Sequence, residues 1–113
     1  MKKLVNIIAC LQNGKAAAET RVTGFVKGEP LLGNVDQLLE AQARVTVAIS
    51  YLGMIEQCLM GRPTMSEAEI VKAAQTRAEN ELWATRHDGD APAIMAWRAT
   101  MAMLIEMLDE PEP

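Results

Sequence analysis

The most hydrophobic stretch of the chain runs from Ala91 to Leu108, and between Ala93 and Ile105 only Arg98 and Thr100 interrupt it. A helix that is apolar on every side has to be covered on every side. The stretch is shorter than a membrane span of about 20 apolar residues and contains an arginine, so we interpret it as a core or interface helix. Its main stripe consists of Ile94, Trp97, Met101, Leu104 and Leu108, whereas Met95, Ala102, Met103 and Ile105 lie off that stripe and need a second covering surface.

A second helix is predicted from Val35 to about Met60. Asn34 is a good N-cap, and Gly61 and Pro63 supply the glycine and the proline that commonly follow a helix. Apolar residues three and four apart form one continuous stripe: Leu38, Ala41, Val45, Ala48, Leu52, Ile55 and Leu59. A second apolar set lies off this stripe: Val47, Tyr51, Met54 and Cys58. A helix with two apolar faces packs between two neighbours, either inside a bundle or across a subunit boundary.

The N-terminal segment allows two interpretations. Steps of four and three residues connect Leu4, Ile8, Leu11, Lys15, Ala18, Val22 and Phe25, which predicts one helix over residues 3–26. Asn13-Gly14 is a strong hairpin signal, however, and the residues on either side have reasonable strand chemistry, so a β-hairpin is the alternative. We favour the helix, either continuous or broken near Gly14, because a lone hairpin would still need a helical layer to cover its apolar face.

The sequence from Ser66 to Glu69, S-E-A-E, is a capping box and predicts that a third helix begins there and runs to about Arg86. One face of this helix carries Ile70, Val71, Ala74, Ala78 and Leu82, and the other positions are mostly polar. We therefore expect it to be the outer, solvated member of the set.

A tight turn is predicted at His87–Asp90, with Asp90 as the N-cap of the fourth helix and Pro92 in its first turn. The H-D-G-D sequence of this turn lacks the further oxygen ligands of a calcium loop. The acidic, proline-rich tail at about 109–113 is expected to be flexible.

The composition is that of one small helical domain over residues 1–113. Half of the residues are hydrophobic but only 4% are aromatic, which favours close-packed helices built from Ala, Leu, Ile, Val and Met. The predicted fold class is therefore all-α, a bundle of three clear helices plus an N-terminal one. Cys10 and Cys58 form no metal-binding motif, so we expect reduced thiols, a cytoplasmic location and no secretion signal at Lys2–Cys10.

Charge varies along the chain. The formal net charge is −4, which argues against nucleic-acid binding because phosphate contacts need a basic face. Residues 1–33 carry five Lys or Arg against two Glu, whereas residues 64–113 carry four against ten acidic residues. The basic N-terminal third and the acidic C-terminal half could orient an encounter with a partner.

The sequence offers little chemistry for catalysis. His87 is the only histidine, so a paired-histidine metal site cannot form within one chain. The pairs Glu67/Glu69 and Glu79/Glu81 are spaced by two residues, which places the partners on opposite sides of a helix. We predict no metal, no cofactor and no enzymatic activity.

The surplus of apolar surface predicts self-association or a partner. We expect a homodimer formed through the second and fourth helices, or a protein partner that covers the same surface. The predicted interface consists of Tyr51, Met54, Met95, Trp97, Arg98, Met101, Met103 and Ile105. The function that we favour is a small acidic interaction protein that binds and inhibits another macromolecule: an adaptor, an immunity-type protein or a phage-encoded inhibitor.

The alternative function is the binding or sequestration of a small anionic ligand such as a nucleotide. In this hypothesis a pocket between helices or subunits is lined by Arg98, Arg77, Lys72 and either Trp83 or Trp97.

Overall fold

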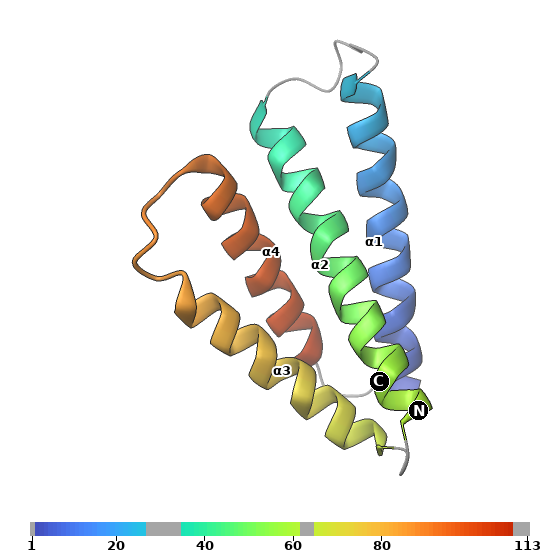
Figure 1. Ribbon diagram of the computed structural model, residues 1–113. Helices are drawn as coiled ribbons and strands as arrows, with labels where there is room; N and C mark the ends of the chain where they lie inside the picture. The colour runs from blue at the N-terminus through green and yellow to red at the C-terminus, as the bar shows by residue number, and fades with distance from the viewer. Residues whose placement is uncertain (1, 27–34, 62–64, 110–113) are drawn as a thin grey trace.

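The computed structural model describes residues 2–26, 35–61 and 65–109, and over these residues the chain consists of helices joined by turns, without strands. The helices are α1 (Lys2–Val26), α2 (Val35–Met60), α3 (Glu67–Ala84) and α4 (Pro92–Asp109). They run alternately up and down (Figure 1), so the predicted all-α bundle is confirmed. The predicted features at Asn34 and Pro63, and the tail beyond Asp109, lie outside the described residues.

Helix α1 passes through Asn13 and Gly14 without a break in its assignment, so the alternative N-terminal hairpin is wrong. Helical spacing buries one face of α1, namely Leu4, Ile7, Leu11 and Ala18. This continuous face packs along α2, with which α1 makes its main contact. The packing of the whole face outweighs the local turn preference of two residues.

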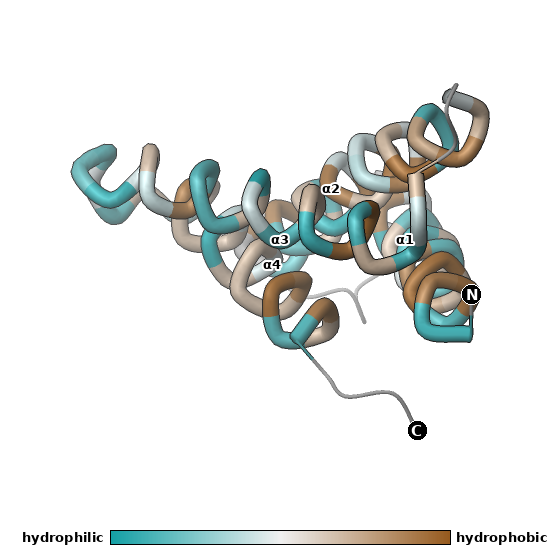
Figure 2. Tube along the Cα trace, turned by 90° about the horizontal axis from the view of Figure 1, so that it is seen from below, coloured by the Kyte–Doolittle hydropathy of each residue, from teal (hydrophilic) through white to brown (hydrophobic). Residues whose placement is uncertain are grey.

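Helix α2 lies between α1 on one side and α3 with α4 on the other (Figures 1 and 2). Its two apolar sets are therefore both covered within one chain, and Val47, Ala48, Tyr51 and Ile55 are buried. Figure 2 shows that each helix carries both hydrophobic and hydrophilic residues, which is the pattern of helices that pack on one side and face solvent on the other.

The N-terminus of α3 has the predicted capping box. The Glu69 backbone N–H donates to Ser66 Oγ (3.3 Å), and the Ser66 backbone N–H donates to Glu69 Oε1 (3.2 Å). These hydrogen bonds to the carboxylate lower the pKa of Glu69 below its ordinary value. The buried residues of α3 are four of the five predicted ones, and its last helical residue is Ala84, two residues before the predicted end.

Helix α4 begins one residue later than the sequence predicts. The Ala91 carbonyl accepts the Met95 N–H (3.0 Å), so Ala91 precedes the first helical residue, Pro92, and Asp90 is not the N-cap. Asp90 instead forms an ion pair, in which its carboxylate lies 3.5 Å from the guanidinium of Arg98. Gly89 before it has a φ of 86°, which glycine adopts without strain.

The core is formed by buried residues from all of these helices. It contains Leu4, Ile7, Leu11, Val47, Ala48, Tyr51, Ile55, Ile70, Val71, Ala74, Ala78, Met101, Leu104 and Leu108. Among the described residues, Tyr51 is the one aromatic side chain of this buried core, in agreement with the low aromatic content of the chain. None of the helices in the described parts of the chain is long and apolar enough to span a bilayer.

Candidate functional site

A cleft opens where α1 and α4 flank α2. Its volume is about 370 Å³, which is within the range of about 300–1,000 Å³ that is usual for small-ligand pockets. Helices α1, α2 and α4 all contribute to its walls: Cys10, Leu11, Gly14, Lys15, Arg44, Val47, Ala48, Thr100, Met103, Leu104 and Met107. A ligand in this cleft, which we call the three-helix cleft, would be enclosed by side chains from three directions.

Small residues create the space. Gly14 has no side chain, and a methyl group added at its Cα would meet no heavy atom within 4 Å. Ala48 contributes only a methyl group to the same cleft. Because α1 and α4 each pack mainly on α2 and not on each other, the region between them is not filled by interdigitated side chains.

Two cations line the three-helix cleft. Lys15 pairs with Glu19 (3.7 Å) and Arg44 pairs with Glu40 (2.7 Å), each one helical turn away. Neither glutamate is among the lining residues, and none of those residues is acidic. The cleft therefore presents positive charge to its interior, although each cation has a surface ion pair that contributes only about 0.3–0.5 kcal/mol.

The Arg44 side chain has an unsatisfied donor. Among the described residues, its Nε is a buried side-chain nitrogen with no hydrogen-bond partner. Its Nη2 donates to Glu40 Oε1 (2.7 Å) and lies 3.8 Å from the Met103 sulfur, a weak acceptor. A buried donor left without an acceptor costs about 1–3 kcal/mol, so this nitrogen marks a position where an acceptor atom would be favourable.

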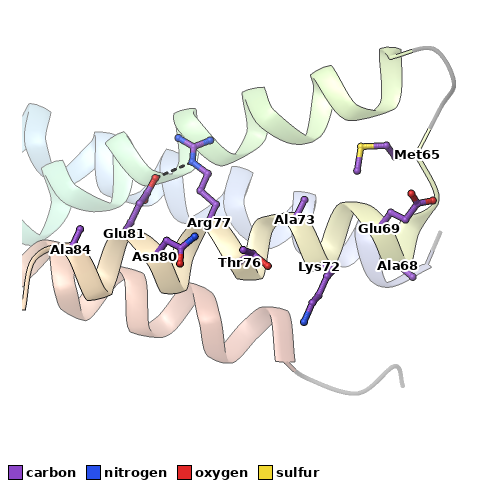
Figure 3. A pocket seen from close by; sticks show the side chains of 10 residues that line it. All are labelled: Met65, Ala68, Glu69, Lys72, Ala73, Thr76, Arg77, Asn80, Glu81 and Ala84. Atoms are coloured by element: carbon purple, nitrogen blue, oxygen red, sulfur yellow. Dashed lines mark hydrogen bonds and ion pairs between the residues drawn. The ribbon is translucent and has the colours of Figure 1, made fainter.

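A second hollow of about 1070 Å³ lies along the outer face of α3 (Figure 3). Met65 and residues of α3 alone line it, among them Lys72 and Arg77 of the predicted anion site. Figure 3 shows Arg77 and Lys72 pointing to opposite sides of the helix. A surface built on one helix covers a ligand from one side only, whereas small-ligand sites bury most of the ligand. Arg98, Trp83 and Trp97 do not line this hollow, so it brings together only two of the residues of the predicted nucleotide pocket.

Arg77 is held by contacts within the chain that connect α3 to α2. Its Nη2 donates to Ser50 Oγ (2.6 Å), its Nε donates to Glu81 Oε1 (2.9 Å), and its guanidinium lies 4.8 Å from the centre of the Tyr51 ring. The Tyr51 hydroxyl donates to Glu81 Oε2 (3.0 Å). Burial and the neighbouring Glu81 carboxylate raise the pKa of Tyr51 well above its ordinary value. This network fixes α3 to α2 at a place where the two helices share few other contacts.

The predicted interface residues are divided between surface and core. Met95 and Met103 are exposed, at 54% and 53% of their surface. Met54, Trp97 and Ile105 are partly buried and pack against the core. Tyr51 and Met101 lie inside the core, at 1% and 0% exposure, so their placement on a partner-binding surface is wrong for this fold. The reason is that α3 and α4 of the same chain supply the covering surface that was expected from a partner.

Arg98 was also predicted as an interface residue, and the structure gives it an internal role. Its Nη2 donates to the Thr85 carbonyl oxygen, and its Nη1 pairs with Asp90 (3.5 Å). Arg98 thereby links the turn between α3 and α4 to helix α4, and its place in a partner-binding surface stays a prediction. The Thr85 carbonyl oxygen also accepts the Asp88 backbone N–H (3.0 Å), so Arg98 adds a second donor to a carbonyl at the end of α3.

The sequence pattern did not identify Lys15, Arg44 and Gly14 as residues of one cleft. A usable signal exists for Lys15, because it is a charged residue at a position of the predicted apolar seam of α1. Such a cation indicates that the seam is not fully covered at that level. The place of Arg44 on the opposite wall follows only from the arrangement of the helices.

In the part of the chain that the structure describes, no group of three or more His, Cys, Asp or Glu residues is arranged so that it could hold a metal ion. Comparisons of the chain with models of known protein families, with curated proteins and with solved structures gave no match.

Proposed function

We propose that the chain is a small non-enzymatic interaction protein that binds another protein through the outer face of α4 and acts as an adaptor or inhibitor. The observation that carries the proposal is a strip of four residues at helical spacing: Met95, Ala99, Ala102 and Met103, all of which are exposed. The strip is about 12 Å long, since each residue of a helix advances the axis by 1.5 Å. All four side chains are exposed, although Met103 also contacts the Arg44 side chain of α2.

The chemistry of this strip favours a helix as the occupant. Two alanines between two methionines allow the backbone of a partner helix to approach closely, while the flexible methionine side chains adjust around it. Helix-on-helix docking of this kind is a common mode of recognition.

The charge around the strip favours a basic partner. Glu106 is exposed on the same face of α4, one turn beyond Ala102, and Asp109 is exposed at the end of the helix. The half of the chain that contains α3 and α4 has a large excess of acidic residues. We therefore assign as the occupant a helix with an apolar face flanked by Lys or Arg.

A synthetic amphipathic peptide of this kind tests the proposal directly. We expect a helix with Leu and Ala on one face and Lys at the flanks to bind the wild-type chain at least tenfold more tightly than the same peptide with Glu at the flanks. Met95→Glu should weaken binding of the Lys peptide at least tenfold. Val5→Glu is the matched control, because Val5 is a similarly exposed apolar residue on α1, and this variant should bind like the wild type.

Light scattering on the same variants separates a foreign partner from a second copy. A wild-type dimer at tens of micromolar that becomes monomeric in Met95→Glu would overturn the assignment and make a second copy of the chain the occupant, as in the predicted homodimer. Equal binding of the two peptides would also overturn it. A monomeric chain that binds the Lys peptide supports the proposal.

Small-ligand binding is the second candidate, and the two cations that line the three-helix cleft, Lys15 and Arg44, favour it. The volume of this cleft corresponds to about 12 water-sized groups at about 30 Å³ each. A nucleoside monophosphate has about twice as many non-hydrogen atoms, and the lining contains no aromatic ring on which a base could stack. The ligand is therefore of another class.

A further inference from the structure

We propose that the three-helix cleft binds a single-chain amphiphile with an anionic head and an apolar tail of medium length. This inference does not rest on the docking strip on α4, although Met103 belongs to both surfaces, because most of the residues that carry it lie on α1 and α2. It follows from the separation of charge and apolar surface within the cleft.

The cationic residues lie at one end of the cleft. Lys15 is four residues after Leu11 on α1, and Arg44 is four residues before Ala48 on α2. Helices α1 and α2 run in opposite directions (Figure 1), so four residues forward on α1 and four residues backward on α2 both move one turn toward the same end of the bundle. The two cations therefore share one level of the bundle, and Leu11 and Ala48 share the next.

Helix α4 extends this polarity. It runs in the same direction as α2 in Figure 1, and Met103 contacts Arg44 through its sulfur (3.8 Å). Met107 is one turn beyond Met103, on the same side as Ala48. The cleft thus has a cationic end at Lys15 and Arg44 and an apolar end at Met107.

Each end selects one part of the ligand. Lys15 and Arg44 line the cationic end, and a carboxylate or phosphate group supplies the opposite charge and acceptor oxygens for these two cations. The apolar end excludes a second charged group, because burying an unpaired charge is unfavourable. The cleft volume corresponds to about 12 non-hydrogen atoms, which is the size of decanoate.

Methionine methyl groups give a local readout of this binding. We expect sodium decanoate, below its micelle concentration, to shift the ¹³C-methyl NMR signals of Met103 and Met107 in the full-length chain. The signal of Met95, which lies outside the cleft, should stay in place. Decanol should bind at least tenfold more weakly than decanoate, and decylammonium should not bind. Decyl phosphate distinguishes the two anionic heads, and tighter binding of either one supports the proposal.

Two pairs of variants test whether binding depends on the Arg44 charge and on the free space at Gly14, and not only on the stability of the fold. Arg44→Gln should weaken decanoate binding at least tenfold, whereas Glu40→Gln, which breaks the same ion pair but leaves the cation in the cleft, should not weaken it. Gly14→Leu should abolish binding by filling the cleft, whereas Gly14→Ala should retain it. Circular dichroism of each variant confirms that it is folded.

Three results would overturn the proposal. The first is equal affinity for decanol and decanoate, which would remove the role of the anionic head. The second is a shift of the Met95 signal as large as those of Met103 and Met107. The third is loss of binding in Glu40→Gln to the same extent as in Arg44→Gln.

Discussion

Replacement of Arg44 by methionine is expected to stabilise the fold. In the wild type the Arg44 Nε is buried without an acceptor, and such a group costs about 1–3 kcal/mol. Methionine keeps an unbranched apolar stem beside Val47 and Met103 and removes the unsatisfied donor. The change also removes the ion pair with Glu40, a half-exposed pair at i and i+4 that contributes about 0.3–0.5 kcal/mol.

The balance of these two terms is a gain of about 0.5–2.7 kcal/mol in the free energy of unfolding. For a domain of this size the melting temperature should rise by about 4 °C for each kcal/mol. Urea unfolding followed by circular dichroism measures the change in the free energy of unfolding when the wild type and the variant are fitted with one shared m-value.

Arg77→Met is the matched control. The Arg77 donors are used by Ser50 and Glu81, and its guanidinium lies on the Tyr51 ring, so its loss should destabilise the chain by about 1–3 kcal/mol. An Arg44→Met variant that is less stable than the wild type would refute the reasoning, because it would mean that Arg44 contributes more to the fold than its orphan nitrogen costs. The same variant should lose decanoate binding, as expected where a ligand site is maintained at the expense of stability.

Three further changes test other parts of the structure. Met101→Ala should cost about 2–5 kcal/mol in urea unfolding, since the side chain is fully buried; a cost below 1 kcal/mol would contradict its core position. Ser66→Ala should lower stability by about 1 kcal/mol through loss of the N-cap. The pKa of Glu69 is lowered in the folded state, so the stabilisation by its carboxylate is present above the ordinary glutamate pKa and is lost as the pH falls through the lowered value. In Ser66→Ala the pKa of Glu69 should return toward its ordinary value, which NMR titration measures. The pKa of Tyr51 is raised, so stability should be full below pH 10 and fall as the pH rises above it, and Tyr51→Phe should remove this alkaline dependence.

The helices could be predicted from the sequence because their signals are local. The capping box at Ser66 and the seven-residue stripe of α2 each depend on spacings within one segment, and the structure has both. The hairpin signal at Asn13-Gly14 is equally local but involves only two residues. The apolar face that runs through α1 on both sides of it determines the outcome.

The positions of single side chains were harder to predict. The second apolar face of α2 correctly indicated a second neighbour, but periodicity does not say whether that neighbour belongs to the same chain. Tyr51 was therefore assigned to an interface, whereas α3 covers it and Glu81 accepts its hydroxyl hydrogen. The main partner of Arg98 is a backbone carbonyl, that of Thr85, and carbonyls have no signature in a sequence.

Met103 belongs to both proposed surfaces, whereas Met95 and Met107 each belong to one, so the methionine signals can distinguish the two kinds of ligand. The Met103 side chain lies at the outer face of α4 and also at the wall of the three-helix cleft. Met95 lies only on the docking strip, and Met107 lies only in the cleft. A Lys-flanked peptide should therefore shift the methyl signals of Met95 and Met103, whereas decanoate should shift those of Met103 and Met107. If both ligands use the Met103 side chain, each should lower the affinity of the chain for the other by the same factor, since the coupling between two binding sites is reciprocal.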